Sequence, residues 1–436
     1  MKIAVFGFAA YLAVGVVLGR PATAQQAEDA PKVKMEPMPQ AYQLPPDKLV
    51  KAEELGKIRT ALDIGGSLWG LLVLWLLLRT QISVRVEEWL KGTGKRPRWV
   101  QGLMYFALLM LVLTVAVWPL DAMGHAASLA FGISVQGWGS WFGDELKSLG
   151  VGLVLATPVM LLFHWIVKVA RKRYWLWAWL VCLPLLVLVI FVAPLIGPLF
   201  DKFEPLSEHH AALVAKLEEV VKRTGTEIPP DRMYLMLASE KTNGLNAYVT
   251  GMGATKRIVV WDTTAGRVPD DVVMFVFGHE SGHYVLHHIQ KMLAIFAVLL
   301  LALFVLTKWL GEWMVRASGA RWGVTSLEQR SGFLVLLFAL TILGLLVQPV
   351  TNAVSRHFEH EADVYGQEAI HGLVADPQKT AVAGFNALGA AWLEDPNPNE
   401  LVEIWEYNHP SVQERATFAQ EYDPWKDGGR GQFFNK

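Results

Sequence analysis

Six apolar runs constrain the fold of this chain more than any other feature of its sequence. Each run has about 18 residues or more with few charges, the length that a helix needs to cross a hydrocarbon core of about 30 Å. Because backbone polar groups in lipid must be satisfied within their own segment, the runs predict membrane-spanning helices. The predicted spans are residues 62–79, 101–120, 149–168, 176–200, 292–310 and 332–353.

The low content of charged residues agrees with a membrane location. Charged side chains make up 18% of the 436 residues, against roughly 25% in ordinary soluble domains. The formal net charge of -1 and the lack of a long basic stripe in the sequence argue against a nucleic-acid partner. The single cysteine, Cys182, lies in an apolar run, which excludes an intrachain disulfide and a thiolate metal cluster.

The first residues have the pattern of a secretory signal peptide. Within residues 1–24, Lys2 precedes an apolar stretch and the small residues Ala22-Thr23-Ala24. We expect removal after Ala24, and an uncleaved first membrane helix is the alternative. Residues 25–60 are polar and contain prolines, so we expect a linker with one short helix before the membrane.

Lysines and arginines are distributed unevenly among the loops between the spans. Residues 79–98 hold six of them and residues 168–173 hold four, which places both loops in the cytoplasm. By alternation, residues 201–291 and the tail after about residue 353 fall on the outer side. Four basic residues between 48 and 59 oppose this assignment, because they lie on the outer flank of the first span.

The segment between the fourth and fifth spans is polar enough to fold outside the membrane. Helical apolar spacing over residues 206–224 ends at Gly225 and two prolines. Short strand-like runs follow at residues 233–237, 247–250 and 258–261. A helix is then expected from Asp270 to about residue 290, with its acidic start on the positive end of the helix dipole. The predicted fold is mainly α, a multi-span transmembrane helical bundle with a small α+β domain.

Residues 279–283 read HESGH, a match to the H-E-x-x-H pattern on the helix expected at 270–290. At 3.6 residues per turn, His279 and His283 project from one face and can share a tetrahedral metal ion. Glu280 is turned toward the open fourth position, where it can act as a base on water. Two satisfied core histidines on an apolar helix are the alternative explanation.

A second acidic motif follows the last span. Glu359 and Asp363 lie one turn apart in a helix expected over residues 355–371. Glu359 can complete a site of two histidines and one glutamate, and Asp363 can accept the free ring N–H of a ligand histidine. The alternative is a solvated acidic helix face. His360 and Glu361 lie off that face, so we expect them to be structural.

Four motifs together resemble the CAAX prenyl protease type 1 family of membrane zinc endopeptidases. They are the HESGH helix, the pattern Ser-Arg-x-x-Glu-x-x-Ala-Asp at 355–363, Asn-Ala-Tyr at 246–248, and His409-Pro410 followed by Glu414-Arg415. The resemblance covers roughly residues 60–420. The family usually reads His-Ser before Asn-Ala-Tyr, whereas this chain has Gly244-Leu245.

The resemblance implies a zincin-like catalytic domain that binds one zinc ion (Zn2+). Its ligands would be His279, His283 and Glu359, with Glu280 as the base and Asp363 behind them. The site would open into a chamber enclosed by the membrane helices. The substrates would be prenylated C-terminal CAAX peptides or other membrane-associated peptides.

Further site residues are expected in the tail and on the sheet. The resemblance places His409 and Arg415 beside the metal, where both can donate to developing negative charge. A loop histidine and a surface arginine are the alternative. Asn246 and Ala247 are expected to bind extended peptide at the sheet edge. A structural or outer-shell role is expected for His288 and its neighbour, residue 287.

We therefore expect a zinc-dependent membrane metalloendopeptidase, with membrane lipid and a peptide or protein substrate as partners. A broad-specificity quality-control protease and a catalytically silent zinc-binding scaffold are the alternatives. The expected location is a bacterial inner membrane with the catalytic face in the periplasm, or alternatively the endoplasmic reticulum. The chain is expected to divide into four parts. They are a signal peptide or first membrane helix at 1–24, a linker at 25–60, a four-span membrane region at 61–200 and a peptidase domain at 201–436.

Overall fold

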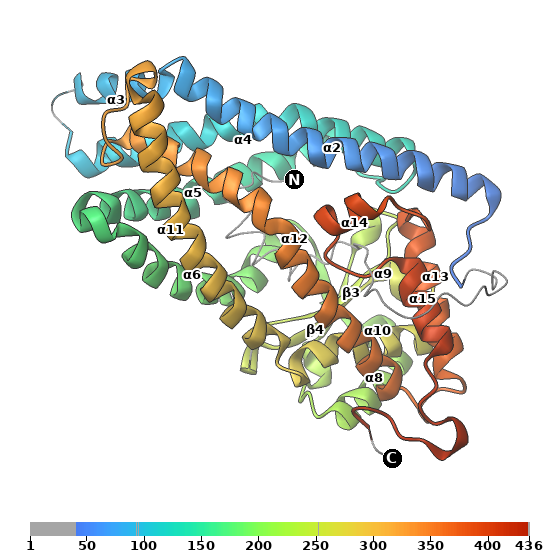
Figure 1. Ribbon diagram of the computed structural model, residues 1–436. Helices are drawn as coiled ribbons and strands as arrows, with labels where there is room; N and C mark the ends of the chain where they lie inside the picture. The colour runs from blue at the N-terminus through green and yellow to red at the C-terminus, as the bar shows by residue number, and fades with distance from the viewer. Residues whose placement is uncertain (1–40, 93, 95, 252, 435–436) are drawn as a thin grey trace, which may run out of the picture.

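The computed structural model describes residues 41–434 except residues 93, 95 and 252. A bundle of long helices forms one end of the molecule, and a small sheet with shorter helices forms the other (Figure 1). The expectations for residues 1–24, and for the first part of the predicted linker up to residue 40, lie outside the described residues.

Five of the six predicted spans lie within a long helix, and the fourth, 176–200, extends four residues past the end of its helix. The helices are α2 (Pro46–Arg79), α4 (Arg98–Ala130), α5 (Trp138–Ala170), α6 (Tyr174–Ile196), α11 (His288–Trp322) and α12 (Arg330–Ala369). Five continuous helical stretches of the described chain are long and apolar enough to cross a membrane, because α5 and α6 belong to one stretch, Trp138–Leu199. The short helix α3 (Ile82–Gly92) follows α2. The mainly α, multi-span prediction is confirmed.

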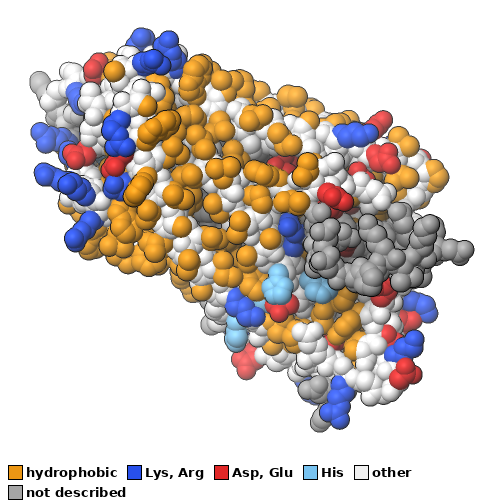
Figure 2. Space-filling view, in the orientation of Figure 1, with side chains coloured by type: hydrophobic (Ala, Val, Ile, Leu, Met, Phe, Trp, Pro, Cys, Tyr) orange, Lys and Arg blue, Asp and Glu red, His pale blue; other side chains and the backbone are white. Residues whose placement is uncertain are grey.

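The surface of the bundle is apolar, as a lipid-facing surface must be. Leu195, Val154 and Trp309 are 75%, 71% and 69% exposed. Hydrophobic side chains cover the bundle in Figure 2, and Lys and Arg gather around α3, at the end far from the sheet. A soluble protein rarely exposes so large an apolar area. The exposed side chains therefore belong in the hydrocarbon region.

Two predicted boundaries were wrong because the helices run further than the apolar runs. Helix α2 begins at Pro46, whose fixed φ suits the first helical turn. Residues 46–60 therefore extend a spanning helix and do not form a linker with a separate short helix. Likewise, residues 355–369 do not form a separate helix but are the end of α12, which also contains the last span. The helix is unbroken at Pro349, which lies within that span. Proline is tolerated in such helices when neighbours satisfy the freed carbonyl.

Helix α12 is held at both ends. Near its start, the backbone N–H of Ser331 donates to Oε2 of the buried Glu87 on α3 at 2.9 Å. Near its end, the Gln367 amide donates to the carbonyls of Ala419 and Tyr422 at 3.0 and 2.9 Å. The neighbouring carboxylate of Glu368 accepts backbone N–H groups of the C-terminal segment, which include those of residues 433 and 434. These contacts leave α12 little freedom to slide.

The sheet has four strands in the order β1-β2-β4-β3. They are β1 (Phe203–Pro205), β2 (Met233–Met236), β3 (Ala247–Thr250) and β4 (Arg257–Trp261). Strands β2 and β4 are parallel, and the other two pairs are antiparallel. The three predicted strands are confirmed, and β1 is an addition that three residues with a proline could not reveal. Strand β3 lies at an edge, because it pairs with β4 alone.

Shorter helices lie at the same end as the sheet, and most of them form a core with it. They are α7 (Leu206–His209), α8 (Ala211–Thr224), α9 (Asp262–Ala265), α10 (Asp270–Val285), α13 (Pro377–Trp392), α14 (Glu400–Glu406) and α15 (Val412–Glu421). The helix expected over 206–224 is broken at His210 into α7 and α8. Leu217 of α8, Val273 of α10 and Phe385 of α13 meet in the core with exposed fractions of 2% or less.

Helices α10 and α12 approach each other through glycines. Gly278 and Gly282 lie one turn apart on α10, and added Cβ atoms would meet the Gly366 carbonyl oxygen at 3.1 Å and the Tyr365 Cβ at 3.0 Å. A Cβ on Gly366 of α12 would lie only 2.8 Å from the backbone nitrogen of His279. The two backbones are therefore almost in contact at the HESGH motif.

The helix that carries the motif ends earlier than predicted. Helix α10 stops at Val285, and His287 adopts a left-handed conformation with φ 58°. Helix α11 then starts at His288. Histidine is one of the few non-glycine residue types enriched in this conformation, although it is uncommon there. The expectation of one helix to about residue 290 was wrong for that reason.

The glycine contact predicts a stability difference between two substitutions in α12. Gly366→Ala should lower the free energy of unfolding by about 1–3 kcal/mol, since its methyl group must push the two backbones apart. Gly344→Ala is the matched control, because its Cβ meets nothing within 4 Å, and it should be neutral. Unfolding in detergent micelles measures both. Equal stability of the two variants would contradict the close approach.

Candidate metal centre

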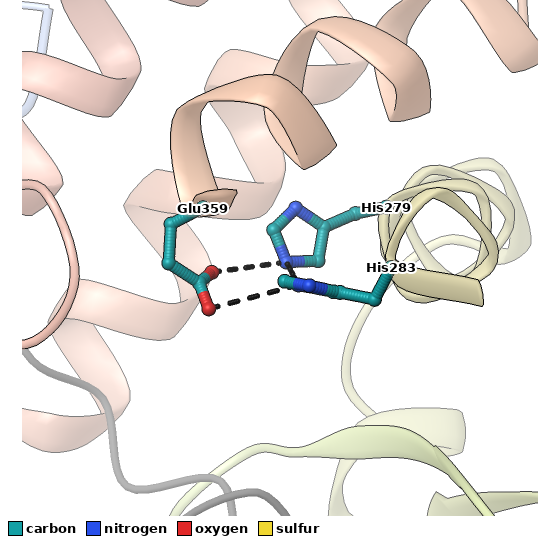
Figure 3. A group of neighbouring side chains, drawn as sticks. All are labelled: His279, His283 and Glu359. Atoms are coloured by element: carbon teal, nitrogen blue, oxygen red, sulfur yellow. Dashed lines mark hydrogen bonds and ion pairs between the residues drawn. The ribbon is translucent and has the colours of Figure 1, made fainter. Parts of the chain in front are cut away.

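Helix α10 supplies two imidazoles and α12 supplies a carboxylate to one cluster (Figure 3). Nε2 of His279 lies 3.2 Å from Nε2 of His283 and 3.2 Å from Oε2 of Glu359. Nε2 of His283 lies 3.6 Å from Oε1 of Glu359. One potential ligand atom from each of the three residues lies within 4.8 Å of the other two. The structure thus brings together three side chains from stretches about 80 residues apart in sequence.

The chemistry of this donor set fits a divalent transition metal. Glu359 is 8% exposed, and its Oε2 is buried. Nε2 of His279 lies 3.2 Å from this oxygen, but the contact does not have hydrogen-bond geometry, and no other residue of the described chain donates to it. A buried carboxylate oxygen without a hydrogen bond is costly unless another partner satisfies it. Two imidazoles and one carboxylate with an open fourth position are the usual ligands of catalytic zinc.

A carboxylate and an arginine stand behind the first histidine. Oδ1 of Asp363 lies 2.8 Å from Nδ1 of His279, and Asp363 is 1% exposed. The guanidinium of Arg415 binds Asp363 with two hydrogen bonds, from Nε at 2.8 Å and from Nη2 at 2.5 Å. Two charge-assisted bonds fix the plane of the carboxylate. Asp363 is therefore oriented toward His279, as the sequence predicted for a partner of a ligand histidine.

The start of α15 explains the position of Arg415. Ser411 and Glu414 form a reciprocal capping box, in which the Ser411 hydroxyl accepts from the Glu414 N–H at 3.0 Å. This cap fixes the first turn of α15 and so the direction of Arg415. Its Nη2 is 4.0 Å from Oε2 of Glu359. The sequence suggested that Arg415 donates to developing charge, but its shortest bonds are to Asp363.

Glu280 lies between the cluster and the edge of the sheet. Its Oε2 accepts a hydrogen bond from the backbone N–H of Val249 in β3 at 3.4 Å. Burial raises the pKa of Glu280 above its usual value, and this outweighs the opposing effect of the two nearby histidines. The carboxylate is therefore a stronger base than a solvated glutamate.

His409 approaches the cluster from the loop before α15. Its Nε2 lies 3.3 Å from Oε1 of Glu359, and its Nδ1 is 2.9 Å from the Asn408 side-chain oxygen. Burial lowers the pKa of His409 to about 4. The ring thus faces the cluster as a neutral imidazole, in agreement with the predicted position.

The predicted peptide-binding residues lie at the start of β3. Ala247 is the first residue of this edge strand, and the backbone N–H of Asn246 donates to the Thr264 hydroxyl at 2.8 Å. A side chain at the preceding Gly244 would collide with the indole of Trp392, whose Nε1 donates to the Leu245 carbonyl at 2.9 Å. The glycine in place of the family's usual histidine therefore makes room for Trp392.

His288, expected to be structural or outer-shell, contacts the second histidine, and Glu361, expected to be structural, contacts His288. Nδ1 of His288 lies 3.1 Å from Nδ1 of His283, and Nε2 of His288 lies 3.1 Å from Oε2 of Glu361. Sequence reasoning gave these residues no specific partner, because a continuous helix would turn His288 away from His283. Only the left-handed residue between the two helices brings the rings together.

Two family models and several known proteins match this chain. Residues 207–423 match the model of peptidase family M48, and residues 30–202 match the CAAX prenyl protease N-terminal region, described as five membrane helices. An uncharacterized metalloprotease, YhfN of Bacillus subtilis, is 33% identical over 377 residues, which is 86% of each chain. The chain belongs to peptidase family M48. It is an integral-membrane metalloprotease, and the family implies a metal cofactor.

Other relatives carry more specific names. CAAX prenyl protease 1 of Saccharomyces cerevisiae is 26% identical over 336 residues, 73% of this chain and 71% of the yeast protein. The crystal structure of S. mikatae Ste24p superposes with a TM-score of 0.74 at 21% identity, over 95% of this chain and 96% of that one. The M48 protein therefore shares the Ste24p fold, and the predicted resemblance to CAAX prenyl proteases is confirmed.

Proposed function

We propose that this M48 protein is a zinc-dependent endopeptidase that cleaves peptides at the membrane surface. The observation that carries the proposal is the meeting of His279, His283 and Glu359 beside a partly buried acid, Glu280, that also contacts an edge strand. A scaffold that kept a metal for structure alone would gain nothing from a base at this place.

The three ligand side chains would hold one zinc ion through Nε2 of each histidine and the carboxylate of Glu359. When bound, the ion supplies Lewis acidity, which polarises a carbonyl and makes water more acidic. The buried Asp363 would support this set, because its Oδ1 lies 2.8 Å from Nδ1 of His279, where it can accept that N–H. Fixing that tautomer leaves Nε2 of His279 free for the metal.

Glu280 would move the proton during hydrolysis. Its carboxylate takes a proton from water at the open position and later gives it to the leaving amine. The raised pKa of Glu280 favours both steps, because a general acid–base catalyst works best with a pKa near the working pH. The Val249 N–H holds the carboxylate in place before substrate arrives.

The open edge of β3 would bind the substrate as an added strand. The antiparallel register pairs Tyr248 with Val259 and Thr250 with Arg257. In such ladders every second residue directs its N–H and C=O away from the partner strand. The Trp261 N–H donates to the Asn246 carbonyl, so Ala247 directs its polar groups to the open edge. A peptide there would lie against Glu280.

The two tail residues would have different roles. His409 is close enough to the cluster to donate to the oxyanion of the tetrahedral intermediate. Arg415 uses its two shortest hydrogen bonds on Asp363. We assign Arg415 the task of orienting Asp363, in place of the oxyanion role suggested by the sequence.

Two glutamine substitutions separate the proposed base from the proposed ligand. Glu280→Gln should retain one zinc ion per chain and lose peptide hydrolysis by at least a factor of about 100, because the amide cannot take a proton. Glu359→Gln should lose both zinc and activity. Metal analysis after dialysis and a fluorogenic peptide assay measure these results. Near-normal hydrolysis by Glu280→Gln would refute the proposed mechanism.

The position of the site favours substrates held at the membrane. Glu359 lies less than two helical turns beyond the predicted span in the same helix, α12. The relatives of this chain include proteins named CAAX prenyl protease 1. We therefore propose membrane-associated or CAAX-like peptides as the substrate class.

Matched peptides test this substrate class. One peptide sequence is assayed in detergent micelles with a C-terminal prenyl group, with a fatty acyl group, and with no lipid. We expect kcat/KM to rise at least tenfold with either lipid, because anchoring concentrates the peptide near the site. A preference for the prenyl form alone would favour CAAX processing. Equal rates for all three would favour the broad-specificity alternative and contradict the proposal.

We also propose that the catalytic end faces the outside of the cell. Basic side chains gather around α3 and the turn between α5 and α6, whereas the metal cluster lies at the other end of the bundle (Figures 1 and 2). Basic loops remain in the cytoplasm. The outer side of a bacterial inner membrane is the periplasm.

Cysteine labelling tests this orientation. The native Cys182 is buried and is replaced by alanine, after which Glu208→Cys or Lys172→Cys is introduced at an exposed site. In intact cells a membrane-impermeant maleimide should label residue 208 and spare residue 172. Labelling of residue 172 alone would reverse the proposed orientation.

A further inference from the structure

The turn between α10 and α11 has a geometry that the chain adopts at some cost. His287 has φ 58°, a conformation that L-residues other than glycine rarely adopt. Such residues often mark functional sites, because the surrounding structure must compensate for the strain. The left-handed conformation of His287 separates the two helices. Helix α10 ends two residues after His283, the last residue of the HESGH motif, and His288 at the start of α11 folds back beside His283.

His288 is nearly enclosed by the two metal-site helices. It is 2% exposed, and its ring stacks on Phe358 of α12 with ring centroids 4.7 Å apart and planes at 22°. Its ring meets that of His283 edge to face at 5.1 Å. A fully buried imidazole needs partners for both nitrogens. They are Nδ1 of His283 and Oε2 of Glu361, each at 3.1 Å.

Only one arrangement of protons satisfies this chain of contacts when the site holds a metal. Nε2 of His283 faces the cluster, so it must be unprotonated to bind the ion and the proton must sit on Nδ1. That Nδ1–H donates to Nδ1 of His288, which must therefore be an acceptor. The remaining proton of His288 is on Nε2 and is donated to the Glu361 carboxylate.

We propose that His288 and Glu361 form a relay that sets the tautomer and orientation of His283 for the metal. This inference rests on the proposed zinc site and assigns two positioning residues to it. Each ligand histidine is then supported by a carboxylate of α12. Asp363 contacts His279 directly, and Glu361 acts on His283 through His288.

Glu361, the carboxylate of the relay, lies on the face of α12 opposite to the expected metal ligand Glu359. Glu361 lies two residues after Glu359 and projects away from the cluster, so it cannot contact a ligand histidine directly. His288 spans that distance from the start of α11. Lys291 and His357 also lie 3.9 Å from carboxylate oxygens of Glu361. The Lys291 contact, to the same oxygen that faces His288, helps to hold the carboxylate there, whereas the exposed His357 approaches the other oxygen and adds little.

Metal affinity measured by chelator competition tests the relay. His288→Leu keeps the size of the side chain but removes the acceptor, and zinc affinity should fall 10–100-fold, the usual effect of losing such a partner. His288→Asn retains an amide oxygen near the position of Nδ1, so its loss should be clearly smaller. Glu361→Gln should give an intermediate loss. His357→Ala is the control, because it removes an exposed imidazole beside Glu361 without touching His283.

The cobalt-substituted protein gives a readout that a purely structural role would not change. The visible absorption of bound Co2+ reports ligand geometry, so it should shift in His288→Leu and stay as in the wild type for His357→Ala. Unchanged affinity and spectrum in folded His288→Leu would overturn the relay. If that variant fails to fold, unchanged affinity in Glu361→Gln overturns it. A wild-type protein that binds no metal would instead overturn the proposed function itself.

Discussion

The near-contact of the α10 and α12 backbones is the constraint on which the site depends. Gly278, Gly282 and Gly366 remove the Cβ atoms that would otherwise separate the helices. A glutamate carboxylate has a short reach, so it can meet two imidazoles of another helix only when the backbones are this close. The same contact aligns Asp363 with His279. Small residues at a helix crossing thus serve chemistry as well as packing.

The sequence predicted most of the site because its signals are local. Helical period alone places His279 and His283 on one face, and Glu359 and Asp363 one turn apart. Long apolar runs are equally direct evidence for the spans. Three features had no such signal. They are the continuation of α12 past its apolar run, the three-residue strand β1, and the left-handed His287 that brings His288 to His283. Each depends on tertiary contacts that no residue pattern records.

One lysine connects the membrane bundle to the sheet that would bind peptide. Lys241 lies in the loop before β3, and its ammonium contacts Asp144 of α5 at 2.8 Å and Asp201, after α6, at 3.0 Å. Nearby, the Val135 N–H donates to the Lys241 carbonyl at 3.0 Å. Since the lysine is largely enclosed, these charged contacts are stronger than surface ion pairs. The edge strand is therefore positioned by the ends of two spanning helices.

The continuity of α12 connects the cluster directly to the bilayer. From Ser331, fixed by Glu87, to Glu359 the helix measures about 42 Å at 1.5 Å per residue. A helix of that length held only at its start would carry the carboxylate about 1.5 Å with a tilt of about two degrees, enough to disrupt metal coordination. Lipid thickness changes helix tilt at modest energetic cost. The contacts at the far end of α12, through Gln367, Glu368 and the glycine contact with α10, therefore protect the spacing of the three ligand side chains from changes in the acyl chains around the bundle.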